Sequence, residues 1–154
     1  VAYMDVDLST ELEALPRLLT ALEGGAQVAI GSRFHPTSRV RRSLRREALS
    51  RGYNLLIRAL FWPPFRDAQC GFKALRREAA QALIPLVKDQ NWFFDTELLL
   101  LAAHRGYAIR EIPVAWNEDP DSRVKIWKTV SQDLRGLLRL RLAFWGISGR
   151  EAHG

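Results

Sequence analysis

The sequence of 154 residues predicts an α/β fold. Short apolar segments typical of buried strands alternate with longer segments in which leucines recur at helical spacing. The hydrophobic fraction of 47% and the charged fraction of 26% are typical of a globular domain that can bury a core. No repeat, low-complexity segment or linker interrupts this pattern. We therefore predict one domain over residues 1–122 and a basic amphipathic helix with a tail over 123–154.

The first half of the chain predicts two strands and two helices. The expected elements are a strand at 1–4, a helix from a Thr10-x-x-Glu13 capping box to Gly24-Gly25, a strand at 27–33 and a helix from about 40 to 61. The strands are short apolar runs, as buried strands are. The capping box and the glycine pair mark the ends of the first helix, and two prolines after residue 62 end the second.

The second half continues the alternation. The expected elements are an extended segment at 67–76, a helix at 77–87, a helix entered from a loop and lying within 91–106, a strand at 107–116, a polar loop at 117–123 and a helix at 124–146. The helices follow from apolar residues at helical spacing, and Gly106 stops the one before the last strand. Strands and helices thus alternate to the end of the chain.

Two aspartates follow the first predicted strand. Asp5 and Asp7 leave that strand at its carboxyl end, which is the edge where open α/β sheets bind ligands. Carboxylates two positions apart can reach one hard cation, and Mg²⁺ or Mn²⁺ usually keeps substrate phosphates among its ligands. The pair therefore indicates a metal–diphosphate site, and the structural alternative is a turn with a helix cap.

Arginines crowd the start of the long helix predicted at 40–61. Arg42, Arg46, Ser50 and Asn54 are spaced by four, which predicts one polar stripe opposite the apolar residues of that helix. Guanidinium groups match phosphate bidentately, and the net charge of +6 favours anionic partners. The alternatives are a solvated basic face and a nucleic-acid surface. The helix lacks interleaved aromatic residues and no binding module is visible, so we expect no nucleic-acid partner.

Three further segments carry charged candidates. Asp67 begins the extended segment 67–76, and it either projects into the cleft of the aspartate pair or is a turn residue. Asp95 and Glu97 stand at a helix start, where carboxylates also favour the helix dipole. Arg123 lies in the polar loop and could neutralise a leaving diphosphate, although an ordinary exposed loop is an equal alternative.

Cysteine, histidine and hydropathy restrict the class of protein. With Cys70 alone, no internal disulfide can form, which fits a reducing compartment. The three histidines have no ligand spacing, so we expect neither a zinc site nor histidine-based catalysis. No apolar run reaches the roughly 18–20 residues that span a bilayer, and no signal peptide is visible.

Seven segments occur in the order found in a known family: YMDVDLST, IGSR, RREALSRGYN, DAQCGFK, WFFDTELL, EIPVAW and DSR. In this they resemble the polyprenyl-phosphate glycosyltransferases, family 2 inverting enzymes of the GT-A fold. The resemblance extends to about residue 125, and QCGFK is closer to the glucosyltransferase branch than to the mannose synthases. It implies that the chain is the C-terminal portion of a GT-A domain and that an N-terminal nucleotide-binding part is missing.

The resemblance also assigns site residues. It implies a metal pair at Asp5 and Asp7 for Mg²⁺ or Mn²⁺, acceptor-phosphate residues Arg33, Arg46, Ser50 and Asn54, a catalytic Asp67, and Arg123 at the donor diphosphate. Ser9 stands where some members have a glutamine that contacts the metal, and Arg123 stands where many have lysine. The serine at position 9 leaves the third metal ligand open.

The implied reaction moves a sugar from a nucleotide sugar, of the UDP-glucose or GDP-mannose type, to dolichyl or undecaprenyl phosphate with inversion. A metal ion would neutralise the leaving nucleoside diphosphate. The acceptor phosphate is already ionised at neutral pH, so it needs positioning more than a general base. The alternatives are a related transferase with a polysaccharide or protein acceptor and a non-enzymatic phosphate-binding domain.

The last predicted helix fits a lipid substrate. Residues 122–154 contain seven Lys and Arg and two Asp and Glu, a net charge of +5. The apolar side of the helix consists of Ile126, Trp127, Val130, Leu134, Leu137, Leu138 and Phe144. A basic amphipathic helix of this kind can lie in an anionic membrane interface. We therefore expect peripheral attachment to the cytoplasmic face of the cell membrane, and the alternative is a helix packed on the core.

Overall fold

The centre of the molecule is a four-stranded sheet. The computed structural model describes residues 1–5, 9–117 and 126–151, and it describes the side chains of these residues except those of 126–130 and 146–151. The strand order is β1 (Ala2–Met4), β4 (Phe72–Leu75), β2 (Val28–Ser32) and β5 (Ile109–Pro113). Strand β4 is antiparallel to β1 and β2, whereas β2 and β5 are parallel.

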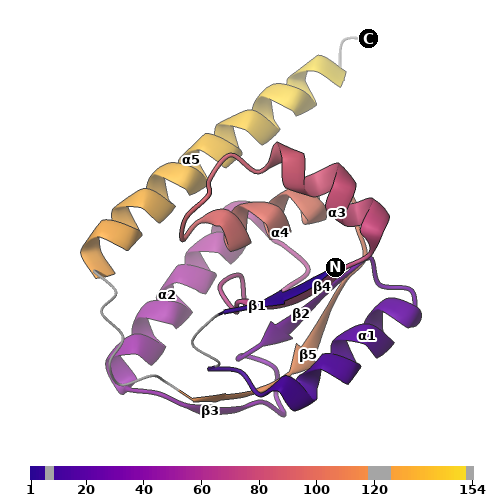
Figure 1. Cartoon of the computed structure of the whole chain (residues 1–154). Helices are drawn as coiled ribbons and strands as arrows, with labels where there is room; N and C mark the ends of the chain where they lie inside the picture. Colours follow the sequence, from indigo (N-terminus) through magenta and orange to yellow (C-terminus); the bar gives the residue numbers. More distant parts are fainter. Residues whose placement is uncertain (6–8, 118–125, 152–154) are drawn as a thin grey trace.

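Helices cover both faces of the sheet (Figure 1). One face carries α1 (Leu15–Glu23), which follows the 3-10 turn η1 (Leu12–Ala14). The other face carries α2 (Leu44–Phe61), α3 (Arg77–Leu83) with the 3-10 turn η2 (Ile84–Leu86), α4 (Phe94–His104) and α5 (Ile126–Glu151). Two separate apolar clusters lie on the two sides of the strands. The α/β prediction is confirmed, with the layers in the order helix, sheet, helix.

The first predicted helix begins later than its supposed capping box. Thr10 is buried and forms an isolated bridge with Trp116, and no side chain caps η1 or α1. Pro16 occupies the first turn of α1, where its missing N–H costs nothing. The capping-box prediction is therefore wrong, because the backbone at Thr10 pairs with a distant strand.

The long helix α2 begins at Leu44 and not near residue 40. Residues Arg39–Arg41 form the strand β3, which pairs in parallel with β6 (Ala115–Asn117) in a small second sheet. The single strand predicted over 107–116 is thus two strands in different sheets. Both differences have the same cause, since a pairing between segments some 75 residues apart is invisible to local periodicity.

Helix α2 also turns a different face inward from the one its apolar pattern predicts. Ser50, Asn54 and Ile57 are buried, whereas Leu44 is 87% exposed and Leu55 is 67% exposed. The inward polar side chains are tolerated because Asn54 hydrogen-bonds to backbone groups. The predicted outward polar stripe is therefore wrong in orientation, and Arg42 is not part of the helix at all.

Helix α5 packs against the same core as α2 and α4. Its Leu137, Leu140 and Phe144 belong to the larger apolar cluster. Gly136 makes this contact possible, because a Cβ there would lie 2.5 Å from ring carbons of Phe93. None of the described helices combines the length and apolar character that crossing a bilayer requires.

Candidate active site

A basic cavity of about 500 Å³ lies where β2 ends and α2 begins. Its lining comes from the loop after β2, from β3 and from the first two turns of α2, and consists of Arg33, Phe34, His35, Pro36, Ser38, Val40, Arg42, Leu44, Glu47 and Arg51. The carboxyl edge of a central strand is the usual place of ligand sites in open α/β sheets. This cavity therefore has both the position and the charge of an anion-binding site.

A buried ion pair between Arg33 and Asp67 borders the cavity. Arg33 donates to the two carboxylate oxygens of Asp67 from Nε and Nη2, both at 2.8 Å, and from its backbone N–H at 2.9 Å. Burial alone would raise the pKa of Asp67, but the charge and hydrogen bonds of Arg33 outweigh it and hold that pKa below its usual value. Burial would lower the pKa of Arg33, and Asp67 raises it. The pair is thus charged, and it fixes the Arg33 guanidinium at the cavity wall.

Backbone contacts hold the loop that carries Asp67. Glu111 accepts hydrogen bonds from the backbone N–H of Arg66 at 2.8 Å and of Asp67 at 3.2 Å. Asn54 accepts from the backbone N–H of Ala68 at 2.9 Å, and its amide nitrogen donates to the carbonyl of Ser50 at 2.9 Å. Strand β5 and helix α2 therefore both anchor this loop, so the position of Asp67 is determined by tertiary structure.

Asp5 lies against Gly71, where β1 ends and the antiparallel β4 begins. Its backbone N–H donates to the Gly71 carbonyl at 2.8 Å, and a Cβ on Gly71 would meet the Asp5 carboxylate at 2.1 Å. Only glycine leaves room for this carboxylate. Within the described part of the chain, no group of three or more His, Cys, Asp or Glu could hold a metal ion. Asp7 lies outside the described residues, so the predicted metal pair stays a prediction.

Strand β4 contains a buried lysine, Lys73, to which the sequence analysis assigned no role. Lys73 is fully buried in β4, pairs with Asp95 at 2.9 Å and donates to the carbonyl of Cys70. Tyr3 donates to the same Asp95 oxygen at 2.6 Å. This network joins β1 and β4 to the first turn of α4. The signal in the sequence was a lysine between apolar residues of a strand, where an unpaired charge would be costly.

Glu47 bridges two arginines inside the basic cavity. It accepts hydrogen bonds from Nε of Arg42 and of Arg51. The Arg42 and Arg51 guanidiniums lie 5.2 and 5.4 Å from the centre of the Phe34 ring. The side chain of Arg42 is only 4% exposed, compared with 26% for Glu47 and 69% for Arg51. A solvated basic face was one alternative for these arginines, and the structure instead brings Arg42, Arg51 and Glu47 together beside Phe34.

The other predicted site residues lie outside the described lining of the cavity or outside the described residues. Ser50 is buried, and its hydroxyl has no hydrogen-bond partner among the described residues. Arg46 is half-buried in the first turn of α2 and is not one of the described residues that line the cavity. Arg123 lies outside the described residues. The roles assigned to Ser50, Asn54, Arg46 and Arg123 stay predictions, although both Asn54 amide atoms already contact backbone groups.

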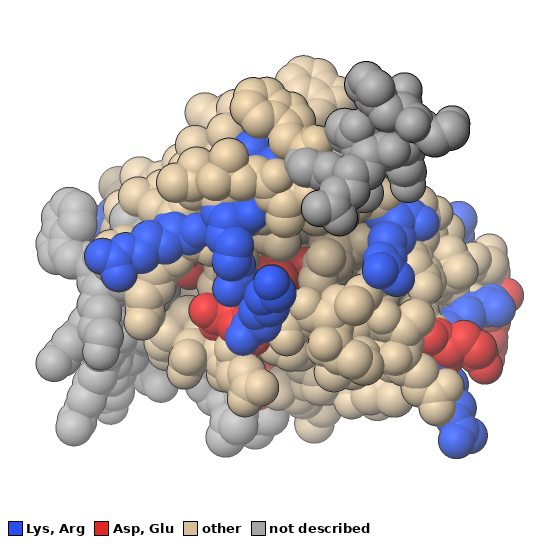
Figure 2. All heavy atoms as spheres, turned by 90° about the horizontal axis from the view of Figure 1, so that it is seen from above, with Lys and Arg blue, Asp and Glu red and all other residues tan. Residues whose placement is uncertain are grey.

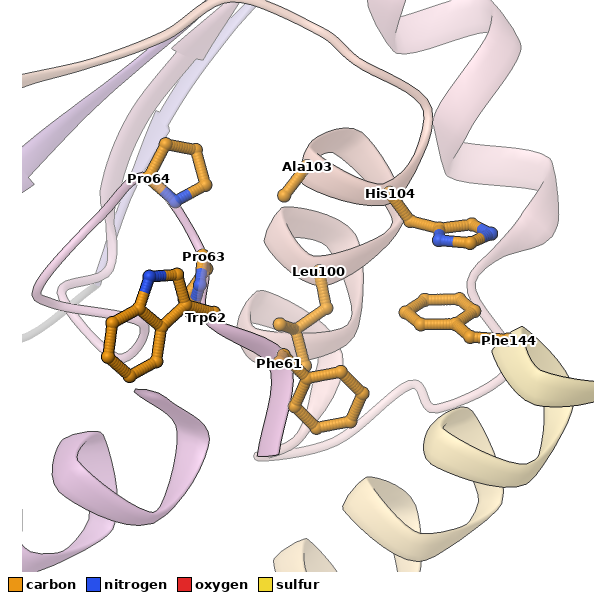
Figure 3. A pocket seen from close by; sticks show the side chains of 8 residues that line it. All are labelled: Phe61, Trp62, Pro63, Pro64, Leu100, Ala103, His104 and Phe144. Carbon is orange, nitrogen blue, oxygen red and sulfur yellow. The ribbon is translucent and has the colours of Figure 1, made fainter. Parts of the chain in front are cut away.

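A second, apolar cavity of about 120 Å³ lies at the other end of α2 (Figure 3). It is lined by Phe61, Trp62, Pro63, Pro64, Leu100, Ala103, His104 and Phe144. The His104 ring stacks on the Phe144 ring with centroids 3.9 Å apart. Among the described residues that line this cavity there is no Lys or Arg to bind a phosphate, so the candidate active site is the basic cavity.

Comparison with known proteins identifies relatives over most of the chain. Glycosyltransferase AglD of Haloferax volcanii is 38% identical over 131 residues, which are 84% of this chain and 21% of that protein. A dolichyl-phosphate beta-glucosyltransferase of Trichomonas vaginalis, ALG5C, is 39% identical over 123 residues, 79% of this chain and 36% of that protein. Polyprenol monophosphomannose synthase of Mycolicibacterium smegmatis is 33% identical over 149 residues, 96% of this chain and 55% of that protein.

The chain spans only about half, or less, of the length of these curated relatives. No protein-family model matches it. The similarity therefore concerns a part of each of these relatives.

Proposed function

The chain is a homologue of the polyprenyl-phosphate glycosyltransferases over most of its length, and from this premise we propose that the domain takes part in sugar transfer to a polyprenyl phosphate. The donor would be a nucleotide sugar, and attack from the opposite side of the anomeric carbon would invert its configuration. The basic cavity bordered by the Arg33–Asp67 pair is the observation that carries this proposal, since it suits a phosphate acceptor.

The acceptor needs orientation and not deprotonation. A phosphate monoester is ionised at neutral pH, so its oxygen is already a nucleophile. The lowered pKa of Asp67 makes it a weak base, which argues against proton abstraction by this residue. Asp67 instead acts as a positioning residue that holds the guanidinium of Arg33 beside the acceptor phosphate. Arg46 and Ser50 lie on α2 outside the described lining of the cavity, and they are proposed to complete the acceptor site from that helix.

Asp5 and Asp7 would hold the divalent cation, Mg²⁺ or Mn²⁺. Carboxylate oxygens are the ligands such hard cations prefer, and Asp5 follows the carboxyl end of β1, the edge where open α/β sheets bind ligands. The bound cation would neutralise charge on the leaving diphosphate. Arg123 would add a second positive charge for the same group.

Helix α5 is proposed to attach the domain to a membrane surface. Leu134, Leu138, Leu142 and Trp145 are 47–64% exposed and recur at helical spacing along its outer side. Arg135, Arg139 and Arg141 lie among them, and the Arg141 guanidinium lies 4.7 Å from the centre of the Trp145 ring. An apolar stripe flanked by arginine suits an anionic lipid interface. Attachment at the cytoplasmic face remains part of this proposal.

The function is tested by transfer assays on the protein that carries this chain. Arg46→Ala should lower kcat/KM for polyprenyl phosphate by roughly ten- to a hundredfold, because a charge-assisted contact is worth about 1.5–3 kcal/mol. Arg46→Lys should restore only part of this, since a point charge cannot form a bidentate fork. Chelation should stop transfer and Mg²⁺ should restore it. The Kd for the nucleotide sugar should barely change.

The matched control is Arg58→Ala, which removes an exposed arginine from the far end of the same helix. It should leave acceptor kinetics unchanged. Weaker nucleotide-sugar binding with intact acceptor kinetics in Arg46→Ala would place this residue in the donor site. Transfer to a neutral polysaccharide or protein, and not to the lipid, would favour the alternative acceptor class.

A further inference from the structure

The basic cavity already contains an anion of the protein itself. Glu47 is the only acidic residue among the described residues that line it, and it lies between the guanidiniums of Arg42 and Arg51. The hydrogen bonds from both arginines outweigh the effect of burial and keep the pKa of Glu47 below its usual value. The carboxylate is therefore ionised at neutral pH and neutralises the two arginines that it bridges.

Arg42 is held more firmly than Glu47, whereas the side chain of Arg51 is mostly exposed. Arg42 is nearly buried and lies over the rings of Phe34 and Trp116, at 5.2 and 6.0 Å from their centres. Phe34 also lies under Arg51. Glu47, in contrast, is 26% exposed and stands in the first turn of a helix, so its side chain can rotate towards solvent. The Arg42 guanidinium would stay in place if this carboxylate moved away, because the rings of Phe34 and Trp116 still hold it.

We propose that Glu47 occupies the anion position of the cavity in the resting domain, and that a phosphate monoester displaces it to be bound by Arg42 and Arg51. The proposal deepens the proposed function and rests on it for the identity of the ligand as the acceptor headgroup. A phosphate offers more charge and more acceptor oxygens than a carboxylate, so it suits two guanidinium forks better. The positive end of the α2 dipole lies at the same place and favours the incoming anion.

Exchange of one anion for another would make binding selective. A neutral ligand cannot compensate Arg42 and Arg51 once Glu47 has left, so only an anion gains from entering. Arg42 and Arg51 thereby become headgroup-binding residues beside Arg33, which lines the same cavity. Glu47 sets the affinity by competing with the ligand.

The test measures binding and not transfer, by calorimetry with inorganic phosphate, farnesyl phosphate and farnesol. Glu47→Gln should tighten the binding of both phosphates by on the order of tenfold, because the competing charge is gone. Arg42→Ala should weaken it by at least tenfold, and Arg51→Ala by less, since that side chain is mostly exposed. Farnesol should not bind through this site. Glu78→Gln, in the first turn of α3, and Arg58→Ala are the matched controls and should change nothing.

Other outcomes would overturn the inference. Weaker phosphate binding in Glu47→Gln would mean that Glu47 positions the arginines and does not compete. Unchanged binding in Arg42→Ala and Arg51→Ala would place the phosphate elsewhere, even if transfer to polyprenyl phosphate were intact. Tighter binding of inorganic phosphate without any binding of farnesyl phosphate would separate the anion site from the lipid acceptor, and would contradict the assignment to the headgroup. Circular dichroism of each variant checks that it is folded.

Discussion

Two buried carboxylates of this domain have opposite electrostatic surroundings. Asp67 is compensated by Arg33, which holds its pKa below the usual value against the effect of burial. Asp133 on α5 is only 3% exposed and one of its oxygens has no hydrogen-bond partner among the described residues. Burial and the nearby charge of Asp89 raise the pKa of Asp133 to about 7. One carboxylate therefore stabilises the fold when ionised, and the other destabilises it.

These pKa shifts predict opposite pH dependences for two variants. Asp133 ionises more easily in the unfolded chain, so it costs stability as pH rises from about 4 to its folded pKa near 7. Asp133→Asn should therefore raise the free energy of unfolding by about 1–2 kcal/mol at pH 8, after allowance for solvent screening, and by almost nothing at pH 4.

Asp67→Asn should have the opposite effect. The lowered pKa of Asp67 stabilises the fold above its unfolded pKa, and this contribution is lost as pH falls through the folded value. The variant leaves Arg33 buried without its partner, so it should lower the free energy of unfolding by about 3–5 kcal/mol at pH 7 and by less below pH 4. Urea denaturation between pH 3 and pH 8 measures both variants. If the change in the free energy of unfolding were the same at every pH for both variants, the charge of the two carboxylates would not be its cause.

Among the helices, α2 and α5 use glycine for different purposes. Gly136 of α5 lies directly on Phe93, which precedes α4, and no other residue fits between them. Gly52 of α2 is exposed, and an added Cβ would meet nothing within 4 Å. The first glycine is required by packing, whereas the second only adds flexibility to the unfolded chain.

Substituting each glycine by alanine should change stability in opposite directions. Gly136→Ala forces α5 away from Phe93 and should lower the free energy of unfolding by about 1–3 kcal/mol. Gly52→Ala improves helix propensity at no steric cost and should raise it by about 0.5–1 kcal/mol. Thermal and urea denaturation of both variants measure this. A neutral Gly136→Ala would mean that α5 does not pack on α4 as closely as the structure has it.

At the scale of the whole molecule, basic and apolar surface lie together on the side that carries α5. Figure 2 views this upper side of Figure 1, where the charged side chains form a few groups of Lys and Arg with Asp and Glu, and uncharged surface lies between them. The net charge of the chain is +6. Such a surface combines attraction to anionic lipid with apolar groups that can enter the interface.

The membrane proposal predicts vesicle binding that depends both on attraction to anionic lipid and on the exposed apolar side chains of α5. The chain should float with vesicles that contain anionic lipid, and less so with neutral vesicles or at high salt, because screening weakens the electrostatic part. Replacing Leu138 and Leu142 together by Gln should reduce flotation several-fold, since both are exposed on α5. The control Leu12→Gln removes an exposed leucine from the α1 side of the sheet and should not reduce it. Equal flotation of all variants would leave α5 as a helix that only packs on the core.

The sequence by itself determined the alternation of strands and helices, because buried strands and amphipathic helices have local periods. The span of α4 and the buried strand β2 were readable in this way, whereas α5 was predicted to end at residue 146 and ends at Glu151. Arg33 and Asp67 were also predicted as site residues, since each stands in a short segment that resembles one of a known family. The contact between the two side chains was not predicted, because 34 positions separate them along the chain.

Only the tertiary structure decided which groups of the candidate site meet. It turned Ser50 and Asn54 of α2 inward, where loop backbone groups could be satisfied, and left Leu44 outside. Local spacing determines which residues share a helix face, but the energy of the whole core determines which face is buried. The Lys73–Asp95 pair and the bridge from Glu47 to Arg42 and Arg51 have the same origin. Buried charges need partners that the fold brings from other elements and loops, and no periodicity in the chain encodes them.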